Sequence, residues 1–316
     1  MKILITGGAG FIGSHTTRLL LERGDKVVCV DNLNNYYSPA QKRKNITPFQ
    51  GNTAFKMYKE DIVEYEKLKQ IFKEEKPDKI IHLAARVGVR PSMEQPFLYE
   101  EVNVRGTLNV LELARHFAIQ NLIVASSSSV YGNNKKVPFS ETDSVDKPIS
   151  QYAVTKKAAE LLCHTYHHLY KLNISCLRFF TVYGPGGRPD MAPYLFTKNI
   201  IEGKPIKRFG DGKSQRDYTY IDDIVKGIVA ALDKNYQYEI FNLGNNQSIA
   251  LNKIIKIIES LLNKKAKIQE CESQPGDVKK TYADITKAKK KLGYRPRVSV
   301  EKGMEKFIKW YLANKK

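Results

Sequence analysis

The chain has 316 residues, of which 42% are hydrophobic and 27% are charged. This composition is typical of a soluble globular protein with one large or two modest domains. No apolar stretch approaches the ~20 residues of a membrane span, and the net charge of +19 comes from short, scattered lysine runs such as 42–44 and 287–291. We interpret these lysines as a solvated surface and expect no binding to membranes or nucleic acids.

The first part of the chain alternates short apolar stretches with segments of helical periodicity. The apolar stretches are nearly continuous, which favours a parallel sheet that is covered by helices on both faces. The expected class is therefore α/β, with a doubly wound parallel sheet. Strands are expected at residues 2–6, 26–31, 55–61, 79–85, 121–129 and 173–180, and helices at 14–23, 64–75, 103–117 and 151–170.

The pattern changes after residue 180, where a stretch rich in glycine and proline begins. We predict a first domain over 1–180 and a second, smaller mixed α/β domain over 181–316, with later segments, about 216–245, returning to the first domain. Strands are expected at 206–209, 216–220, 239–244 and 266–271, and helices at 222–232, 251–262, 285–292 and 300–312.

The four cysteines lie far apart and form no C-x-x-C pair. Three of them stand in apolar stretches, which favours buried thiols over disulfides and predicts a cytoplasmic location. The spacing of His164, His167 and His168 on one expected helix could hold a metal ion. We predict no metal site there, because that helix carries a stronger motif, described below.

Gly7, Gly10 and Gly13 form a G-x-x-G-x-x-G motif between the first strand and the first helix. Glycines at such positions permit a tight turn, let backbone N–H groups approach a pyrophosphate and allow the helix to pack closely on the strand. Asp31 ends the second strand, where an acid binds the adenosine ribose and repels a 2′-phosphate. The motif predicts a Rossmann-type domain that binds NAD rather than NADP.

Tyr152 and Lys156 lie one turn apart on the expected helix 151–170. A nearby ammonium group favours the phenolate, so a tyrosine with an ordinary pKa near ~10 could act as a base at neutral pH. Chance alone supplies many such pairs. This pair gains weight because it follows a nucleotide-binding motif and a strand that ends in four serines, residues 126–129.

The Tyr152/Lys156 pair, the spacing of the glycines and the stretch HLAA at 82–85 occur together in this chain. In these features the sequence resembles the extended short-chain dehydrogenase/reductase family. The resemblance covers essentially the whole chain and implies NAD as cofactor and a homodimer. It implies Ser127 as the third catalytic residue beside Tyr152 and Lys156, with Lys156 also on the nicotinamide ribose. The cofactor-binding residues that it implies are Gly7, Gly10, Phe11, Ile12, Gly13, Asp31, Asn32, Asp61, Ile62, Leu83, Ala84, Ala85, Tyr152 and Lys156.

The residues at the two positions before Val130 differ between members of this family that catalyse different reactions. Members that dehydrate nucleotide sugars carry an Asp-Glu pair there, and members that decarboxylate UDP-uronic acids carry a Glu next to the valine. Here Ser128 and Ser129 occupy these places, and neither can act as a carboxylate acid or base. The resemblance leaves reactions that need one hydride and one proton, namely epimerisation at C4 or a plain oxidation or reduction.

The stretch RFFTVYGPGGRPDMA at 178–192 resembles that of UDP-glucuronate 4-epimerases. UDP-galactose 4-epimerases usually have an asparagine in place of Thr181 and lack R-P-D-M-A. A uronate carries a carboxylate, which an arginine binds through two parallel hydrogen bonds, so Arg188 is the candidate partner. Ser128, Ser129 and Thr181 could donate to the same carboxylate.

Three further positions match the family pattern for the UDP group. Arg216 would bind the diphosphate, Phe209 would lie near the uridine and Asp277 would bind the ribose. The family often has an arginine just before the Gly-Asp at 276–277, where this chain has Gln274 and Pro275, so one phosphate contact is open. The predicted substrate-binding residues are Ser127, Ser128, Ser129, Thr181, Arg188, Phe209, Arg216 and Asp277.

The predicted activity is that of an NAD-dependent epimerase. It inverts C4 of a UDP-sugar by removing and returning a hydride through a 4-keto intermediate, with UDP-glucuronate and UDP-galacturonate as the favoured pair. The alternative is the same reaction on UDP-glucose and UDP-galactose. A lesser alternative is a non-catalytic NAD-binding regulatory protein, since fold alone does not fix function.

Overall fold

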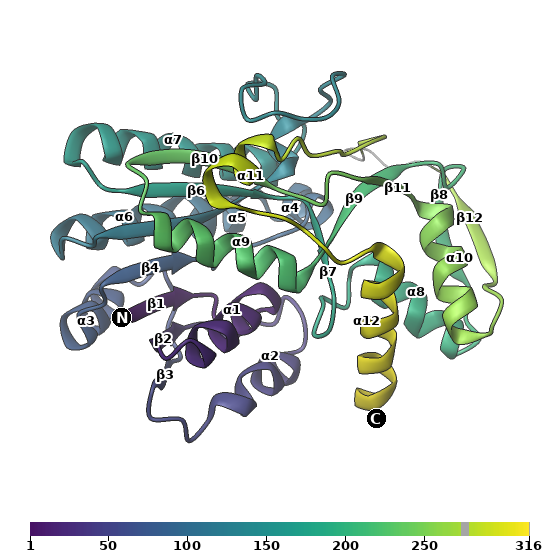
Figure 1. Cartoon of the computed structure of the whole chain (residues 1–316), viewed down its shortest axis with the longest axis horizontal. Helices are drawn as coiled ribbons and strands as arrows, with labels where there is room; N and C mark the ends of the chain where they lie inside the picture. The colour runs from purple at the N-terminus through teal and green to yellow at the C-terminus, as the bar shows by residue number, and fades with distance from the viewer. Residues whose placement is uncertain (273–277, 316) are drawn as a thin grey trace.

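A seven-stranded parallel sheet forms the centre of the computed structural model, which describes residues 1–272 and 278–315 (Figure 1). The strand order is β3-β2-β1-β4-β5-β6-β10. The order reverses between β1 and β4, which is where a doubly wound sheet binds its ligand. The strands are β1 (Lys2–Thr6), β2 (Lys26–Val30), β3 (Phe55–Tyr58), β4 (Lys79–His82), β5 (Asn121–Ser127), β6 (Ile174–Phe179) and β10 (Tyr238–Leu243).

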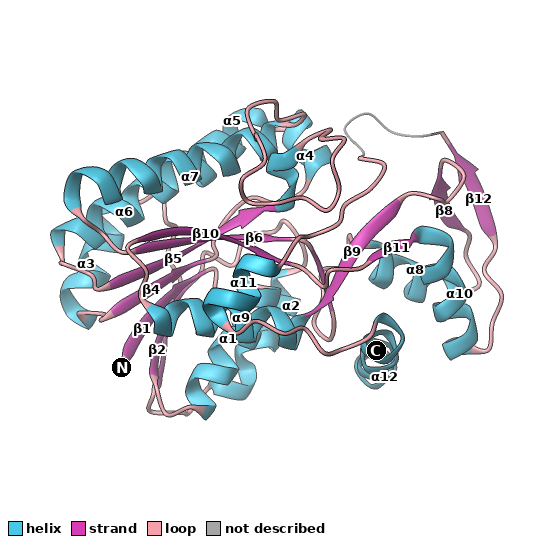
Figure 2. Ribbon diagram, turned by 45° about the horizontal axis from the view of Figure 1, so that its top comes forward, coloured by secondary structure: helices cyan, strands magenta, loops and turns pink. Residues whose placement is uncertain are grey.

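Alternate side chains of the strands enter two separate cores, one on each face of the sheet. Ile3 and Ile5 belong to one core, and Leu4 belongs to the other, as the two-residue period of a strand requires. Helices therefore cover both faces (Figure 2). They are α1 (Phe11–Glu22), α9 (Ile221–Lys234) and α11 (Thr286–Leu292) on the first face, and α3 (Tyr65–Glu75), α6 (Gly106–His116) and α7 (Gln151–Tyr170) on the second.

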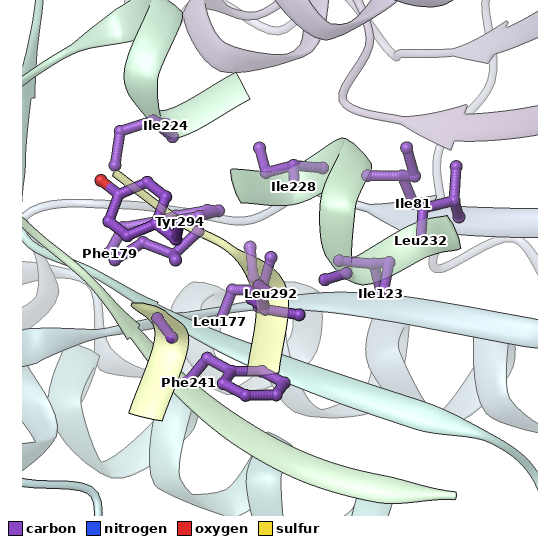
Figure 3. Close-up of a cluster of buried hydrophobic side chains, with 14 of the residues drawn as sticks. Ile81, Ile123, Leu177, Phe179, Ile224, Ile228, Leu232, Phe241, Leu292 and Tyr294 are labelled. Atoms are coloured by element: carbon purple, nitrogen blue, oxygen red, sulfur yellow. The ribbon is translucent and has the colours of Figure 1, made fainter. Parts of the chain in front are cut away.

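The helix α9 provides much of the first core. Its Ile224, Ile228 and Leu232 are fully buried and pack with Ile123 and Leu177 of the strands (Figure 3). Because α9 comes late in the chain, the first core joins segments that are about a hundred residues apart in the sequence.

Smaller elements surround the carboxyl edge of the sheet and the start of α1. The helix α2 packs against α1, and α4 and α5 pack against α7. A π-helical segment, η2, leads directly into α6, and a 3-10 turn, η3, follows β5. Their bounds are α2 (Pro39–Ile46), η1 (Thr47–Phe49), α4 (Val89–Glu94), α5 (Pro96–Glu100), η2 (Glu101–Arg105) and η3 (Ser128–Tyr131).

A second, mixed α/β region lies at one end of the large sheet (Figure 1). Three strands pair as β11-β9-β7 and two more as β12-β8, and three helices pack around a core that includes Phe196, Ile254 and Phe307. Among the residues that the structure describes, no helix combines the length and apolarity needed to cross a lipid bilayer. The elements are β7 (Thr181–Tyr183), α8 (Ala192–Ile201), β8 (Ile206–Phe209), β9 (Gln215–Tyr220), β11 (Ser248–Ala250), α10 (Leu251–Leu262), β12 (Ile268–Cys271) and α12 (Val300–Asn314).

Several strands end earlier in the structure than the sequence predicted. The sheet strands expected at 55–61, 79–85 and 121–129 end at Tyr58, His82 and Ser127, so their last residues belong to loops at the carboxyl edge. Of the segment 216–245, α9 and β10 pack on or join the large sheet, whereas β9 pairs with β7 and β11. The division of the chain into two domains stays a prediction.

Candidate active site

A cavity of about 480 Å³ lies over the carboxyl ends of the sheet strands, between the large sheet and the strands β7 and β9. Loops after parallel strands meet at this edge, so residues far apart in the sequence come together there. The cavity is lined by every predicted catalytic and cofactor-binding residue and, of the predicted substrate-binding residues, by Ser127, Ser128, Ser129, Thr181, Arg188 and Arg216.

The glycine loop has no room for side chains. A Cβ atom on Gly13 would lie 2.2 Å from the carbonyl oxygen of Gly7, and one on Gly7 would lie 2.7 Å from the backbone nitrogen of Ala84. Gly7 also has φ +72°, which favours glycine. The backbone of the loop and the N-terminus of α1 can therefore approach a pyrophosphate directly, as a dinucleotide requires.

Asp31 is fixed in place at the end of β2. Its carboxylate accepts hydrogen bonds from the N–H groups of Ala9 at 3.2 Å and Leu33 at 2.8 Å. The Lys42 Nζ atom lies 3.7 Å from it, and Asn32 donates to Asp61 at 2.6 Å. This polar group suits an adenosine ribose.

The interpretation of Lys42 as a solvated residue is wrong. Only 5% of Lys42 is exposed, and burial lowers its pKa while the charge of Asp31 acts against that shift. The helix α2 places Lys42 and Ile46, four residues apart, on its buried face. This spacing was the available sequence signal, although nothing in the sequence names Asp31 as the partner.

The three predicted catalytic residues come together at the end of β5. The Ser127 hydroxyl donates to Ser129 Oγ and accepts the N–H of Ser129, both at 3.1 Å, and it lies close enough to the Tyr152 hydroxyl to lower the pKa of that tyrosine. Lys156 Nζ donates to the carbonyl oxygen of Ala125 at 2.8 Å. Tyr152 and Lys156, one turn apart on α7, together with Ser127 at the end of β5, can position a substrate hydroxyl and move its proton.

Burial acts on both ionisable groups of this set. It raises the pKa of Tyr152, and the hydrogen bond from Ser127 and the charge of Arg188 act in the opposite direction. It lowers the pKa of Lys156 to about 8, while nearby Cys163, Cys176 and Glu160 act against that shift. Arg188 is thus a second cation near the tyrosine, which the motif on the helix alone does not reveal.

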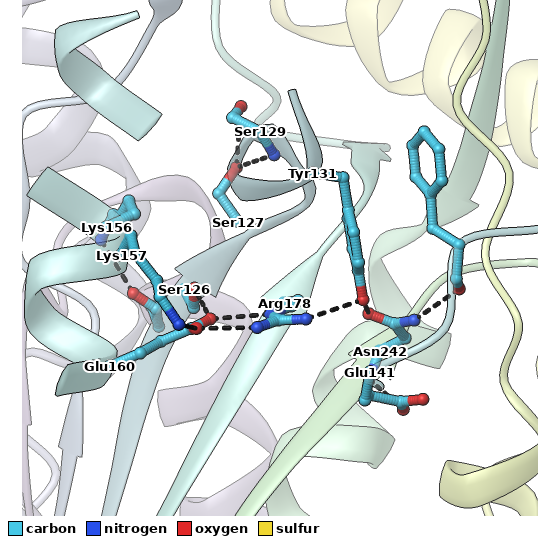
Figure 4. A network of polar contacts seen from close by, with 12 residues as sticks. Ser126, Ser127, Ser129, Tyr131, Glu141, Lys156, Lys157, Glu160, Arg178 and Asn242 are labelled. Atoms are coloured by element: carbon cyan, nitrogen blue, oxygen red, sulfur yellow. Dashed lines mark hydrogen bonds and ion pairs between the residues drawn. The ribbon is translucent and has the colours of Figure 1, made fainter. Parts of the chain in front are cut away.

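A buried polar network lies behind the catalytic residues (Figure 4). Arg178 donates to both carboxylate oxygens of Glu160 at 2.8 Å, and Ser126 donates to the same carboxylate at 2.6 Å. Arg178 also donates to the hydroxyl of Tyr131 at 3.0 Å, which in turn donates to Asn242 at 2.7 Å. The network joins α7 to β5, β6, η3 and β10, so it fixes the catalytic helix to the sheet.

Arg188 lies in the loop between β7 and α8 and reaches the cavity. Its guanidinium group contacts Asp190 and Tyr36. Tyr36 and its neighbour Tyr37 also line the cavity, and the motifs did not predict them. They follow Asp31 in a loop whose course depends on tertiary contacts, so no local pattern identified them.

Two predicted residues stand apart from this site. Phe209 is absent from the described lining of the cavity, and its ring instead stacks with Arg90 of α4 at 4.6 Å. Its role beside the uridine stays a prediction. Asp277 lies outside the described residues, as do Gln274, Pro275 and Gly276.

Comparison with known proteins agrees with this geometry. The sequence model of a family described as GDP-mannose 4,6 dehydratase matches residues 4–307. A UDP-glucuronate 4-epimerase of Thermodesulfobacterium geofontis is 49% identical over 312 residues, which cover 98% of this chain and 96% of that protein.

Two solved structures share the whole fold. The UDP-glucuronic acid 4-epimerase of Bacillus cereus, in complex with UDP-glucuronic acid and NAD, has a TM-score of 0.94 and 39% identity, with 99% of each chain covered. The UDP-glucose 4-epimerase of Thermotoga maritima, with UDP-glucose, has a TM-score of 0.92 and 33% identity, with 100% of each chain covered. The chain therefore belongs to the extended short-chain dehydrogenase/reductase family, in the group described as GDP-mannose 4,6 dehydratase, and is similar to its nucleotide-sugar 4-epimerases.

Proposed function

We propose that the protein is an NAD-dependent epimerase that inverts C4 of a UDP-sugar, with UDP-glucuronate and UDP-galacturonate as its substrate pair. The observation that supports this choice of sugar is a set of hydrogen-bond donors beside the catalytic tyrosine that could bind a carboxylate. Ser128, Ser129, Thr181 and Arg188 line the same cavity as Tyr152. Relatives named UDP-glucuronate 4-epimerase, at 49% and 45% identity, support the proposal.

The glycine loop and the Asp31 group fit NAD, as described above. Bound NAD supplies an acceptor for the C4 hydride and returns that hydride to the opposite face of the sugar. Tyr152, as the phenolate, takes the proton of the C4 hydroxyl and later gives it back, while Ser127 holds the same oxygen by a hydrogen bond. The positive charge of Arg188 favours the phenolate against the effect of burial, and we assign the same effect to Lys156, one turn away on α7.

The neighbours of Ser127 argue against elimination of water from the keto sugar. Elimination of water from a 4-keto sugar needs a further acid and base. Ser128 and Ser129 stand at the cavity where dehydratases of the family carry carboxylates. In the proposed reaction the keto sugar instead turns over and is reduced again.

Tyr152→Phe separates catalysis from mere NAD binding. The variant should keep its NAD and lose at least about 10²-fold to 10⁴-fold in turnover, because it lacks the proton-transfer group. Cofactor content after heat release and product formation by NMR measure the two effects. Retained activity would remove Tyr152 from its catalytic role, and a wild-type protein inactive on every UDP-sugar tested would favour the regulatory alternative.

Arg188→Ala tests the choice of sugar. Loss of a charge-assisted hydrogen-bonded pair is worth about 1.5–3 kcal/mol, so kcat/KM for UDP-glucuronate should fall by roughly 10-fold to 100-fold. The value for UDP-glucose should fall clearly less, because a hydroxymethyl group carries no charge and only the effect of Arg188 on the pKa of Tyr152 is lost. Arg115→Ala on the outer face of α6, where Arg115 pairs with Glu112 at 2.9 Å, is the matched control. Equal losses on both sugars would favour the neutral-sugar alternative.

A homodimer is part of the same proposal. Phe97 of α5 is 87% exposed, and Leu161 and Val154 of α7 are 56% and 42% exposed. Since α5 and α7 are packed together, their exposed apolar side chains suit burial by a second copy. Leu161→Glu should halve the mass measured by light scattering; a wild-type monomer at micromolar concentration would contradict the dimer.

We also place the protein in the cytoplasm. Cys29, Cys163, Cys176 and Cys271 are free thiols, which suits a reducing compartment. Fractionation of the source cells tests this, and recovery of the protein outside the cytoplasm would contradict it.

A further inference from the structure

Arg188 already holds a carboxylate in this structure. Its Nε atom donates to Asp190 Oδ1 at 3.0 Å, and its Nη2 atom donates to Asp190 Oδ2. Both residues belong to the loop before α8. The pairing keeps the pKa of Asp190 below its usual value although burial acts in the opposite direction. The planar two-oxygen contact is the one that a uronate carboxylate would need.

Tyr36 connects this pair to the other side of the cavity. Its hydroxyl accepts a hydrogen bond from Arg188 Nη2 at 3.2 Å and donates to Asp190 Oδ2 at 3.3 Å. Its ring lies 5.3 Å from the guanidinium carbon, within reach of a cation–π contact. Tyr36 therefore touches the arginine through both its ring and its hydroxyl.

The backbone of Tyr36 is tied to the ribose-binding segment. The N–H of Tyr36 donates to Asn34 Oδ1 at 3.1 Å, and the N–H of Asn34 donates to Asn32 Oδ1 at 3.0 Å. Lys42 also donates to Asn34 Oδ1 at 3.1 Å and lies 3.7 Å from Asp31. This chain of contacts holds Tyr36 at a fixed place relative to the cofactor site.

The loop after β4 fixes the hydroxyl of Tyr36 from another direction. A Cβ atom on Gly88 would lie 2.8 Å from that oxygen, and Gly88 has φ +97°. The hydroxyl thus lies where a side chain on residue 88 would stand. The glycine at position 88 therefore leaves room for the Tyr36 hydroxyl beside Arg188.

We propose that Asp190 occupies the place of the substrate carboxylate on Arg188, and that Tyr36 is the positioning residue that keeps the guanidinium aimed at the cavity during the exchange. The inference rests on the proposed action on a uronate. A uronate replaces one carboxylate by another, so the half-buried guanidinium group stays paired throughout. A neutral hexose offers no such exchange and leaves the Arg188–Asp190 pair intact. Discrimination between the two sugars therefore depends on Tyr36 and Asp190 as well as on Arg188.

The two residues should have opposite effects on the uronate. Asp190→Asn weakens the internal competitor, so KM for UDP-glucuronate should fall about tenfold, which corresponds to about 1.4 kcal/mol. Tyr36→Phe removes the hydroxyl that orients Arg188, so KM for UDP-glucuronate should rise about tenfold with kcat within about threefold. Neither variant should change KM for UDP-glucose by more than about twofold. Asp190→Glu should restore a KM close to that of the wild type.

The experiment compares steady-state kinetics on both sugars, NAD content and melting temperature for each variant. Asp233→Asn, which breaks the Arg23–Asp233 ion pair at 2.8 Å, and Tyr236→Phe, which removes a hydroxyl bonded to Lys291 O at 2.8 Å, are the matched controls. If Asp190→Asn is unstable, Asp190→Ser replaces it, and its KM for UDP-glucuronate should fall in the same way.

The outcomes separate this inference from the proposed function. A wild-type protein without turnover of UDP-glucuronate would overturn both. A wild-type protein that epimerises UDP-glucuronate, with an Asp190→Asn variant whose KM is unchanged or higher, would overturn the exchange alone. Loss of NAD in Tyr36→Phe, or equal changes of KM on both sugars, would overturn the positioning role of Tyr36.

Discussion

The buried pair Glu160–Arg178 allows a quantitative prediction about the support of the catalytic helix. Their side chains are 2% and 1% exposed, and two hydrogen bonds of 2.8 Å join them. Glu160→Gln leaves the guanidinium buried without its carboxylate, and Arg178→Met leaves the carboxylate with only the more distant Lys157, at 3.8 Å, as a counter-charge. Either change should cost about 3–5 kcal/mol of unfolding free energy.

The double variant should cost much less than the sum of the two. With both charges removed, the remaining loss comes from the hydroxyls of Ser126 and Tyr131, which lose their charged partners. Such losses are about 1–3 kcal/mol each. We therefore expect Glu160→Gln/Arg178→Met to be destabilised by about 2–6 kcal/mol, against a sum of about 6–10 kcal/mol for the two single variants, with a coupling energy of about 4 kcal/mol at the middle of these ranges.

Denaturation by urea, monitored by fluorescence and circular dichroism, measures these differences. For a chain of this length, about 1 kcal/mol corresponds to a shift of about 1.5 °C in Tm, so each single variant should melt about 5–8 °C lower. Glu305→Gln on α12, where Glu305 pairs with Lys302 at 2.8 Å on the surface, should change Tm very little. Additive losses, with the double variant as unstable as the sum of the singles, would refute the account of this pair.

Two further predictions concern the cofactor and the catalytic lysine. Gly13→Ala should lose bound NAD at least about tenfold more readily, since its Cβ would lie 2.2 Å from Gly7 O. Gly24→Ala strains the backbone at φ +89° but meets nothing within 4 Å and lies away from the cavity, so it should keep its NAD. Equal NAD content in both variants would contradict this. Burial lowers the pKa of Lys156 from 10.5 to about 8, so the folded chain binds this proton less tightly than the unfolded chain. The shift lowers the free energy of unfolding by up to about 3 kcal/mol. This loss of stability is fully present below about pH 8 and disappears as the pH rises towards 10.5. Lys156→Met should therefore be inactive yet have a higher free energy of unfolding than the wild type at pH 7. In urea denaturation this gain in stability should be smaller at about pH 9.5. The same gain at both pH values would refute the lowered pKa of Lys156.

The elements with strong local signals could be predicted from the sequence. The expected helix 151–170 coincides with α7, because Ser150 caps its first turn through the N–H of Ala153 at 3.2 Å and Lys171 ends it in the left-handed conformation. The glycine motif could also be interpreted from the sequence alone, because its three glycines lie within one strand–turn–helix unit.

The elements around the substrate side were harder to predict. The helix α8 begins at Ala192, directly after a stretch that glycine and proline marked as irregular, and Pro193 in its first turn is compatible with a helix start. The strand β7 has three residues and is defined by its pairing with β9. No local period indicates an element of that length.

The partners of site residues also escaped prediction. The importance of Arg188 was visible in its motif, but its contacts with Tyr36 join positions 152 residues apart. The burial of Lys42 likewise depends on the loop after β2 and on Asp31. Such contacts follow from the assembled sheet, so neither composition nor spacing reveals them.

The most direct test of the central claim is to incubate the purified protein with UDP-glucuronate, without added NAD, and to follow the sugar by proton NMR. The account predicts conversion to UDP-galacturonate until equilibrium, with little conversion of UDP-glucose in a parallel sample and no accumulation of NADH. Conversion of UDP-glucose to UDP-galactose with UDP-glucuronate left unchanged, or continuous release of NADH, would contradict it.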